Sequence, residues 1–131
     1  MSTYLILSNS YSLLRVAIDR IAYITSDSSY SILKLINGEE YTFSFNLSSF
    51  EKILEHQLQS EAEIFIRIGK CFIINSNYIY TIHITKQELI LSDSSFSEKF
   101  ILKISKEALK VLKTIIENSV NIGRIEEWEK I

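Results

Sequence analysis

A lysine in a short turn between two apolar runs is the feature of this sequence best suited to a binding chemistry. Within residues 64–68, isoleucines alternate with other side chains, and a strand with that period buries one face and exposes the other. Gly69 frees the backbone for a bend, and residues 72–74 indicate a second, buried strand. This arrangement would hold the Lys70 ammonium group rigidly at a surface corner.

The composition indicates one globular domain. The chain has 131 residues, 47% of them hydrophobic, and it has no proline. Cys71 is its only cysteine, so no intramolecular disulfide can form; we expect Cys71 to be a small core residue and the protein to be cytoplasmic. No segment approaches the roughly 20 apolar residues of a membrane helix, so no membrane association is expected. The net charge of −2 and the pI near 5.7 count against nucleic-acid binding.

Residues that could support catalysis are scattered. The two histidines, His56 and His83, have no HxxxH or cysteine partner, so a zinc site is not expected. The three glycines lie far apart and form no phosphate-binding loop. No spaced pair of acidic residues stands out either. We therefore expect no enzyme activity, no metal and no cofactor.

Short alternating segments predict that the domain is mainly β. Asn37-Gly38 separates two such segments, residues 30–36 and 39–45, and we expect a type I′ hairpin turn with positive φ at both turn residues. Polar residues 26–29 predict a loop. In residues 78–85 the alternation predicts one shared face, made of Tyr78, Tyr80, Ile82 and Ile84. The other predicted strands are residues 5–8, 12–16, 21–24, 65–68, 72–74, 88–91 and 100–104.

Two amphipathic helices are expected. Ser48 and Glu51 have the spacing of a capping box, which predicts that a helix covers residues 49–58. Ser105 is a suitable cap for a second helix over residues 106–118. Residues 119–131, which include Glu126, Glu127 and Glu129, are expected to be an acidic tail, so that the folded domain is residues 1–118.

The segment from Phe65 to Asn75 resembles the signature of the LytTR family, the DNA-binding domain of many bacterial response regulators. The family pattern runs roughly Phe-x-Arg-x-His-x-Ser-Tyr-x-Val-Asn. Three residues match it outright: Phe65, Arg67 and Asn75. Phe72 and Ile74 are near-equivalents, whereas Gly69 and Cys71 replace the usual histidine and serine. The order of the other elements also follows the family from about Leu5 to Asn118.

The resemblance implies an elongated stack of antiparallel β-sheets with two short helices, which reads double-stranded DNA through loops. By this resemblance Ser28, Ser29 and Tyr30 form the first reading loop, Lys70 reaches the major groove, and Lys106 replaces an arginine that follows the serine before the last helix. Cations in such positions suit base edges, and hydroxyl groups suit phosphates. The implied function is sequence-specific regulation of transcription.

Plainer roles remain open for several of these residues. Lys70 and Lys106 could be ordinary solvated lysines at turns. Arg67 lies on a strand face beside Phe65, where an arginine serves as readily in an ion pair as in DNA binding. Lys110 is either on the solvated side of the last helix or close to a phosphate. Asn75 is expected to make a local hydrogen bond.

The sequence leaves two functions to compare. The first is a stand-alone LytTR-type regulator that contacts direct-repeat half-sites as two copies and receives its signal from a separate receiver or sensor protein. The alternative is a LytTR-like protein-interaction module that has lost DNA binding, for which the acidic balance and the exposed tyrosines leave room. Binding to DNA that weakens steeply with salt would distinguish the two.

Overall fold

The computed structural model describes residues 3–128, which form ten strands and two α-helices, each α-helix following five strands. The first half contains β1 (Tyr4–Ser8), β2 (Leu13–Ala17), β3 (Ile21–Asp27), β4 (Tyr30–Leu35), β5 (Glu40–Phe43) and α1 (Leu47–Leu58). The second half contains β6 (Phe65–Ile68), β7 (Phe72–Asn75), β8 (Ile79–His83), β9 (Glu88–Leu91), β10 (Phe100–Lys103) and α2 (Lys106–Ser119). Three short 3₁₀ helices lie between strands or after α1: Ile18–Arg20, Gln59–Ile64 and Ser76–Tyr78.

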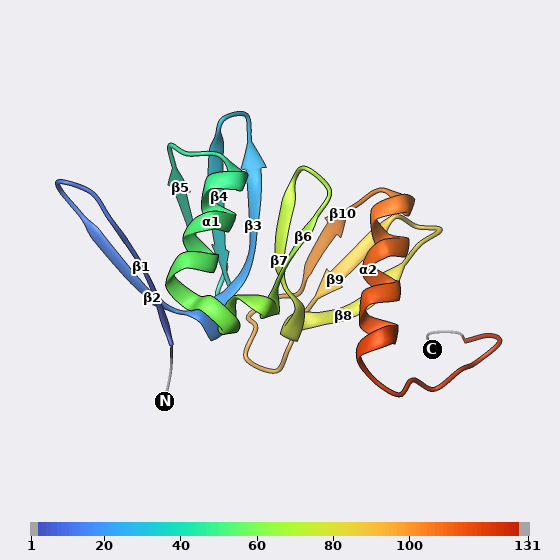
Figure 1. Ribbon diagram of the computed structural model, residues 1–131. Coiled ribbons are helices and arrows are strands. Elements are labelled where there is room, and N and C mark those ends of the chain that lie inside the picture. Colours follow the sequence, from blue (N-terminus) through green and yellow to red (C-terminus); the bar gives the residue numbers. More distant parts are fainter. Residues whose placement is uncertain (1–2, 129–131) are drawn as a thin grey trace.

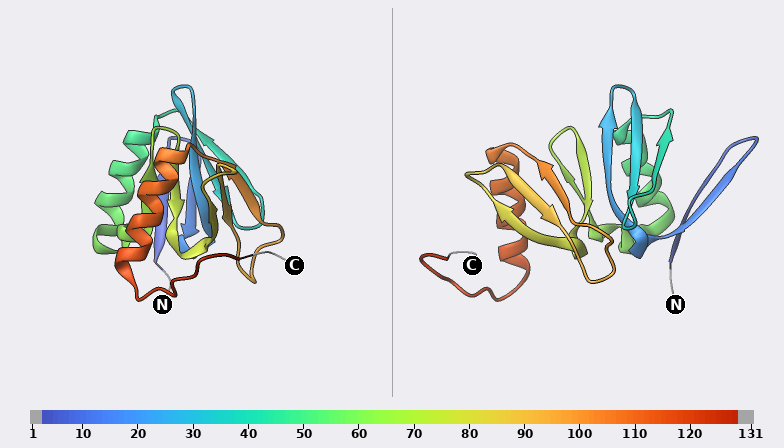
Figure 2. Two further views of the ribbon diagram at one scale, coloured as in Figure 1. Left: turned by 90° about the vertical axis from the view of Figure 1, so that its right-hand side faces the viewer. Right: turned by 180° about the vertical axis from the view of Figure 1, so that it is seen from behind.

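The strands form three antiparallel sheets that follow one another across the molecule (Figure 1). The β1–β2 hairpin stands at one end, and the central sheet has the order β5-β4-β3-β7-β6. The third sheet has the order β10-β9-β8. Helices α1 and α2 lie on the same face of this array (Figure 2). The prediction of a mainly β stack with two short helices is therefore confirmed.

Two hydrophobic cores lie on either side of the middle of the central sheet. The first joins β1, β2 and the central sheet to α1, where Phe50 is fully buried against the rings of Phe43 and Phe45. The second joins β6, β7 and the third sheet to α2. Successive residues of β7 contribute to different cores, because side chains alternate along a strand: Ile73 belongs to the first and Ile74 to the second.

The hairpin predicted at Asn37-Gly38 is present, but its turn is not of type I′. Of these two residues only Gly38 has a positive φ, +92°. The Gly38 N–H donates to the Leu35 carbonyl and the Leu35 N–H donates to the Glu39 carbonyl, both at 2.9 Å. Three residues therefore connect the strands, and glycine takes the left-handed position that closes such a loop.

Helix α1 begins earlier than the capping-box pattern predicted. Its N-cap is Asn46, whose side-chain oxygen accepts a 2.9 Å hydrogen bond from the Ser49 N–H, so Ser48 is not the cap. The helix starts at Leu47, which is buried in the first core. Glu51 instead forms an ion pair with Arg67. For α2 the prediction is confirmed, since Ser105 accepts a hydrogen bond from the Ala108 N–H.

The predicted common face of residues 78–85 is interrupted by a bulge. The pairing of β8 with β9 shifts between Ile79 and Thr81, which adds one residue to β8. As a result Tyr80 is 69% exposed, whereas Tyr78 and Ile82 pack against the second core. The expectation that Tyr80 shares their face was wrong, because a bulge changes the alternation of side chains.

Asn75 is one of two fully buried polar residues in the described chain, and it joins β7 to the start of β3. Its side-chain amide donates to the Ile21 carbonyl at 2.9 Å, and its side-chain oxygen accepts from the Asn77 N–H at 3.1 Å. The predicted local hydrogen bond is confirmed, and a longer-range one accompanies it.

Replacing Asn75 with alanine should lower the free energy of unfolding by about 2–3 kcal/mol, because the buried Ile21 carbonyl loses its side-chain donor. Urea unfolding followed by circular dichroism measures this change. The matched control is Asn77→Ala, at an exposed neighbouring position, where we expect a change within about 0.5 kcal/mol. Equal effects of the two substitutions would contradict a structural role for the Asn75 side chain.

Candidate nucleic-acid interface

Three connections lie together at one end of the molecule (Figures 1 and 2). They are the β3–β4 turn at Ser28-Ser29, the β6–β7 loop at residues 69–71, and the β10–α2 junction at residues 104–106. We call this end the three-loop rim. All three strand ends point the same way because β3, β6 and β10 run in the same direction (Figure 1).

The β3–β4 turn is shorter than the polar loop predicted for residues 26–29. Strand β3 continues to Asp27, which pairs with Tyr30, so Ser28 and Ser29 alone form the turn. Ser28 has a φ of +59° and Ser29 has no positive φ, which is the pattern of a type II′ turn. Glycine is the usual residue at the first central position of this turn, so Ser28 holds a strained backbone conformation.

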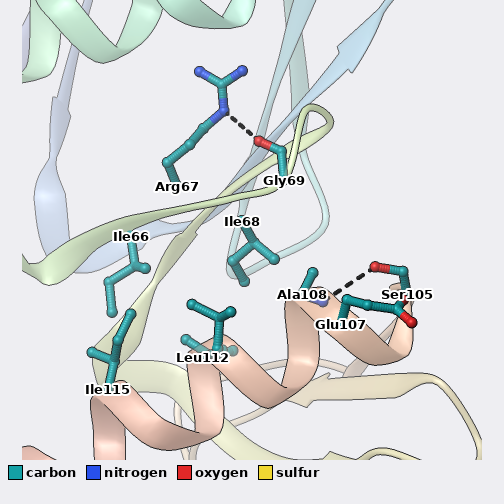
Figure 3. Close-up of a pocket in the computed structure, with 10 residues that line it drawn as sticks. Ile66, Arg67, Ile68, Gly69, Ser105, Glu107, Ala108, Leu112 and Ile115 are labelled. Atoms are coloured by element: carbon teal, nitrogen blue, oxygen red, sulfur yellow. Dashed lines mark hydrogen bonds between the residues drawn. The ribbon is translucent and has the colours of Figure 1, made fainter.

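The β6–β7 loop is held from inside by Arg67. The hairpin pairs Ile68 with Phe72, and Gly69 takes a φ of +57° in the loop between them. The Arg67 guanidinium donates to the Gly69 carbonyl at 3.0 Å (Figure 3) and to the Lys70 carbonyl at 3.4 Å. It also donates to the Glu51 carboxylate of α1 at 3.2 Å. The donors of Arg67 are thus directed at the loop backbone and at α1.

The same loop is fixed from outside by the end of β3. The Cys71 carbonyl accepts hydrogen bonds from the Ser26 N–H at 2.9 Å and from the Thr25 hydroxyl at 3.1 Å. Cys71 itself is exposed, so the prediction of a core cysteine was wrong. The reason is the turn: Cys71 follows Gly69 and Lys70 before the strand resumes, and it lies outside both cores. Its carbonyl couples the loop to the β3–β4 turn.

The β10–α2 junction completes the rim beside the β6–β7 loop. A groove of about 350 Å³ separates β6 from α2 and is lined at one end by Gly69 and Ser105. Figure 3 shows Ile66 and Ile68 of β6 facing Ala108 and Leu112 of α2 across it. The start of α2 is therefore placed next to the loop that carries Lys70.

The described structure shows no ion pair for three of the predicted cations, the ammonium groups of Lys70, Lys106 and Lys110, all of which belong to exposed residues. Lys103 and Lys113 of the same region do form ion pairs. Lys103 pairs with Glu88 at 3.0 Å and its hydrogen bond lowers the pKa of that carboxyl. Lys113 pairs with Glu117 at 2.7 Å and lowers the Glu117 pKa in the same way.

The predicted site residues are only partly brought together. Ser28, Ser29, Lys70 and Lys106 all belong to the three-loop rim. Lys110 lies one turn further along α2, and Tyr30 lines a different groove, next to β5. The sequence prediction missed the supporting residues, among them Thr25, Ser26 and Glu51. Local spacing gave no signal for them, because Thr25 and Cys71 are 46 residues apart in the chain.

The described residues offer little for other kinds of site. Within residues 3–128, no group of three or more His, Cys, Asp or Glu side chains is arranged to hold a metal ion. None of the helices in the part of the chain that the structure describes is long and apolar enough to cross a membrane.

The comparisons with known proteins agree with the fold. The family model of the LytTr DNA-binding domain matches residues 11–117. A structure described as the LytTr DNA-binding domain of a methyl-accepting/DNA response regulator from Bacillus cereus is similar, with a TM-score of 0.59 and 20% identity. That similarity covers 88% of this chain and 97% of the other. A search of the curated proteins finds no match.

A mainly β domain of stacked antiparallel sheets with this signature defines a class of DNA-binding domains. The family match covers most of the sequence, and the chain belongs to the LytTr DNA-binding domain family.

The strain at Ser28 leads to a paired prediction. Ser28→Gly should raise the free energy of unfolding by roughly 0.5–1 kcal/mol, because glycine adopts positive φ without a steric penalty. Ser29→Gly should lower it by a similar amount, roughly 0.5–1 kcal/mol, because Ser29 has no positive φ and glycine only adds disorder to the unfolded chain. Urea unfolding of both variants tests this difference. A Ser28→Gly protein less stable than Ser29→Gly would contradict the assigned turn.

Proposed function

We propose that this protein regulates transcription by binding double-stranded DNA sequence-specifically through the three-loop rim. The observation that carries the proposal is the rim itself: three connections from distant parts of the sequence meet at one end and carry Lys70 and Lys106 without ion pairs in the described structure. A lysine that forms no ion pair within the protein can bind a nucleic-acid groove without first breaking a bond to a carboxylate.

The parts of the rim have different roles in this proposal. The Lys70 side chain enters the major groove, where a well-aligned contact contributes about 1–3 kcal/mol of base discrimination. The hydroxyl groups of Ser28 and Ser29 contact phosphates, which set the position of the protein on the duplex. The N-terminal end of α2 points at the rim and adds a partial positive charge near Lys106.

Arg67 acts as a positioning residue in this proposal. Its three hydrogen bonds join the carbonyls of Gly69 and Lys70 to Glu51, so the Lys70 side chain starts from a rigid backbone. A rigid loop loses less conformational entropy on binding. Lysine at position 106 cannot make the two-pronged contact of an arginine with guanine, so we expect weaker base selectivity there.

The overall negative charge is compatible with DNA binding because of where the acidic segment begins. Helix α2 has 14 residues and is therefore about 21 Å long. Its first residue is at the rim, whereas residues 120–128 follow its other end (Figure 1). We assign residues 1–118 to DNA binding and residues 119–131 to an acidic tail; of these, 1–2 and 129–131, with Glu129, lie outside the described residues.

Two further parts of the proposal concern partners. Two copies occupy direct-repeat half-sites, since one rim spans only a short stretch of duplex. The signal comes from a separate receiver or sensor protein. Tyr30 and Lys110 border the rim and contribute secondary contacts to the DNA backbone.

Substitution of the rim lysines tests the proposal. A cognate site is first selected from a random DNA pool. Lys70→Ala and Lys106→Ala should each weaken binding to it about tenfold, as expected for the loss of a 1–3 kcal/mol contact, and should leave the melting temperature unchanged. The matched control is Lys99→Ala, at the opposite end of β10, which should bind like the unmodified protein. Wild-type affinity in both rim variants would remove the three-loop rim as the binding surface.

The salt dependence of the same binding separates the regulator from an interaction module. Affinity for DNA should fall steeply with added salt, because each neutralised phosphate releases counterions. Replacing one phosphate-contacting lysine should reduce the slope of log affinity against log salt by about 1. Retention of no DNA fragment even at low salt would favour the interaction module.

A further inference from the structure

A second surface of the molecule lies between the β1–β2 hairpin and β5, at the end of the array that carries the hairpin (Figure 1). A groove of about 900 Å³ separates them, and residues of α1 also line it. Its apolar lining includes Leu13 of the hairpin, Tyr41 and Phe43 of β5, and Ile53 of α1. We call it the hairpin groove.

One wall of the hairpin groove is an open sheet edge. Strand β5 is the last strand of the central sheet and pairs only with β4. The Leu35 N–H bonds to the Glu39 carbonyl, so in the same register the main-chain groups of Tyr41 and Phe43 face β4. The N–H and carbonyl of Thr42 therefore point away from β4, into the groove. No hydrogen-bond partner for them is found within residues 3–128.

The opposite wall of the groove is the β1–β2 hairpin, which is held away from the open edge of β5. The Gln57 side chain takes both main-chain groups of Ile6: it donates to the carbonyl at 2.6 Å and accepts from the N–H at 3.0 Å. Leu5 and Leu7 anchor the hairpin in the first core. The side chains of Ile6 and Leu13 are left 43% and 63% exposed beside the groove.

The hairpin groove is uncharged. None of its lining residues is Asp, Glu, Lys, Arg or His, although 23% of the chain is charged. A charged group placed there would lose hydration without gaining a partner. An occupant therefore has to be uncharged, and its chemistry must include donors and acceptors that match an open β-strand.

We propose that the hairpin groove binds an extended, uncharged peptide segment of a partner protein, which adds to β5 as a further strand. The Thr42 N–H and carbonyl pair with the peptide backbone, and alternate peptide side chains contact Tyr41 and Phe43 or the hairpin. An open, flat edge of this kind is a template for strand addition. The inference does not depend on DNA binding.

A single strand fits this groove better than a second copy of the chain. A second β5 would bring its own β4 and hairpin into the space next to the first hairpin, which already stands beyond β5 (Figure 1). A small uncharged molecule would fill the apolar walls but would not match the main-chain groups of Thr42 in register.

The test uses a display library of random nonapeptides and the full chain. Selected sequences should be uncharged and should alternate apolar side chains. The most enriched peptide is then synthesised with a fluorescent label and its dissociation constant is measured by anisotropy. Selection of charged peptides, or of none, would overturn the proposal. So would an uncharged dye such as Nile red binding in the groove when no peptide does, because this indicates a small-molecule site.

The decisive variant is Thr42→Pro, which removes the outward N–H while Tyr41 and Phe43, whose main-chain groups face β4, keep their own N–H groups. It should weaken peptide binding at least tenfold. The matched control is Ile101→Pro, at an outward position on the open edge of β10, which should bind the peptide normally. Equal binding by Thr42→Pro and the unmodified protein would refute strand addition.

A second variant decides the outcome if Thr42→Pro does not fold. Leu13→Asp places a charge on the exposed wall of the groove without removing a buried contact, and it should also weaken peptide binding at least tenfold. Sedimentation velocity without peptide completes the test. A concentration-dependent dimer that Leu13→Asp abolishes would overturn the proposal in favour of a second copy.

Discussion

The pairing of β3 with β7 is the constraint on which the rest of the structure depends. It aligns Ile24 with Ile73 and Thr25 with Phe72, and it continues as the hydrogen bond from the Ser26 N–H to the Cys71 carbonyl. Because β7 contributes to both cores, this register fixes the two halves of the molecule against each other. A shift of one residue would exchange the side chains of the two cores. The relative height of the β3–β4 turn and the β6–β7 loop therefore follows from core packing.

Local patterns predicted most of the fold because most strands pair with their neighbours in sequence. The two hairpins at Asn37-Gly38 and Gly69-Lys70, and the cap at Ser105, are each determined by residues only a few positions apart. The errors arose where the burial of a side chain outweighed local pattern. Helix α1 starts at Leu47, which is buried, with Asn46 as its cap, and a bulge in β8 turns Tyr80 away from the core that Tyr78 and Ile82 contact.

The sequence predicted the loop that carries Lys70, but it did not predict the contacts that hold this loop in place. Alternation around Gly69 was enough to expect a rigid lysine at a corner. The contacts that make the corner rigid join residues that are far apart in sequence, such as Arg67 with Glu51 and Thr25 with Cys71. The role of Arg67 could not be decided beforehand, because its ion-pair partner Glu51 is 16 residues away in the chain and lies on α1.

The central sheet separates two surfaces of different chemistry. Strand β4 starts at Tyr30, directly after the rim turn, and the Tyr30 side chain lines the uncharged hairpin groove. Lys34 of β4 is paired with Glu40 of β5. Lys70 and Lys106, which have no ion pair in the described structure, lie at the rim, where a polyanion can approach, whereas the open main-chain groups of β5 face a groove without charge. Because β4 pairs with β5 and begins directly after the rim turn, a strand added to β5 would be only one strand away from the strand that carries the turn at Ser28.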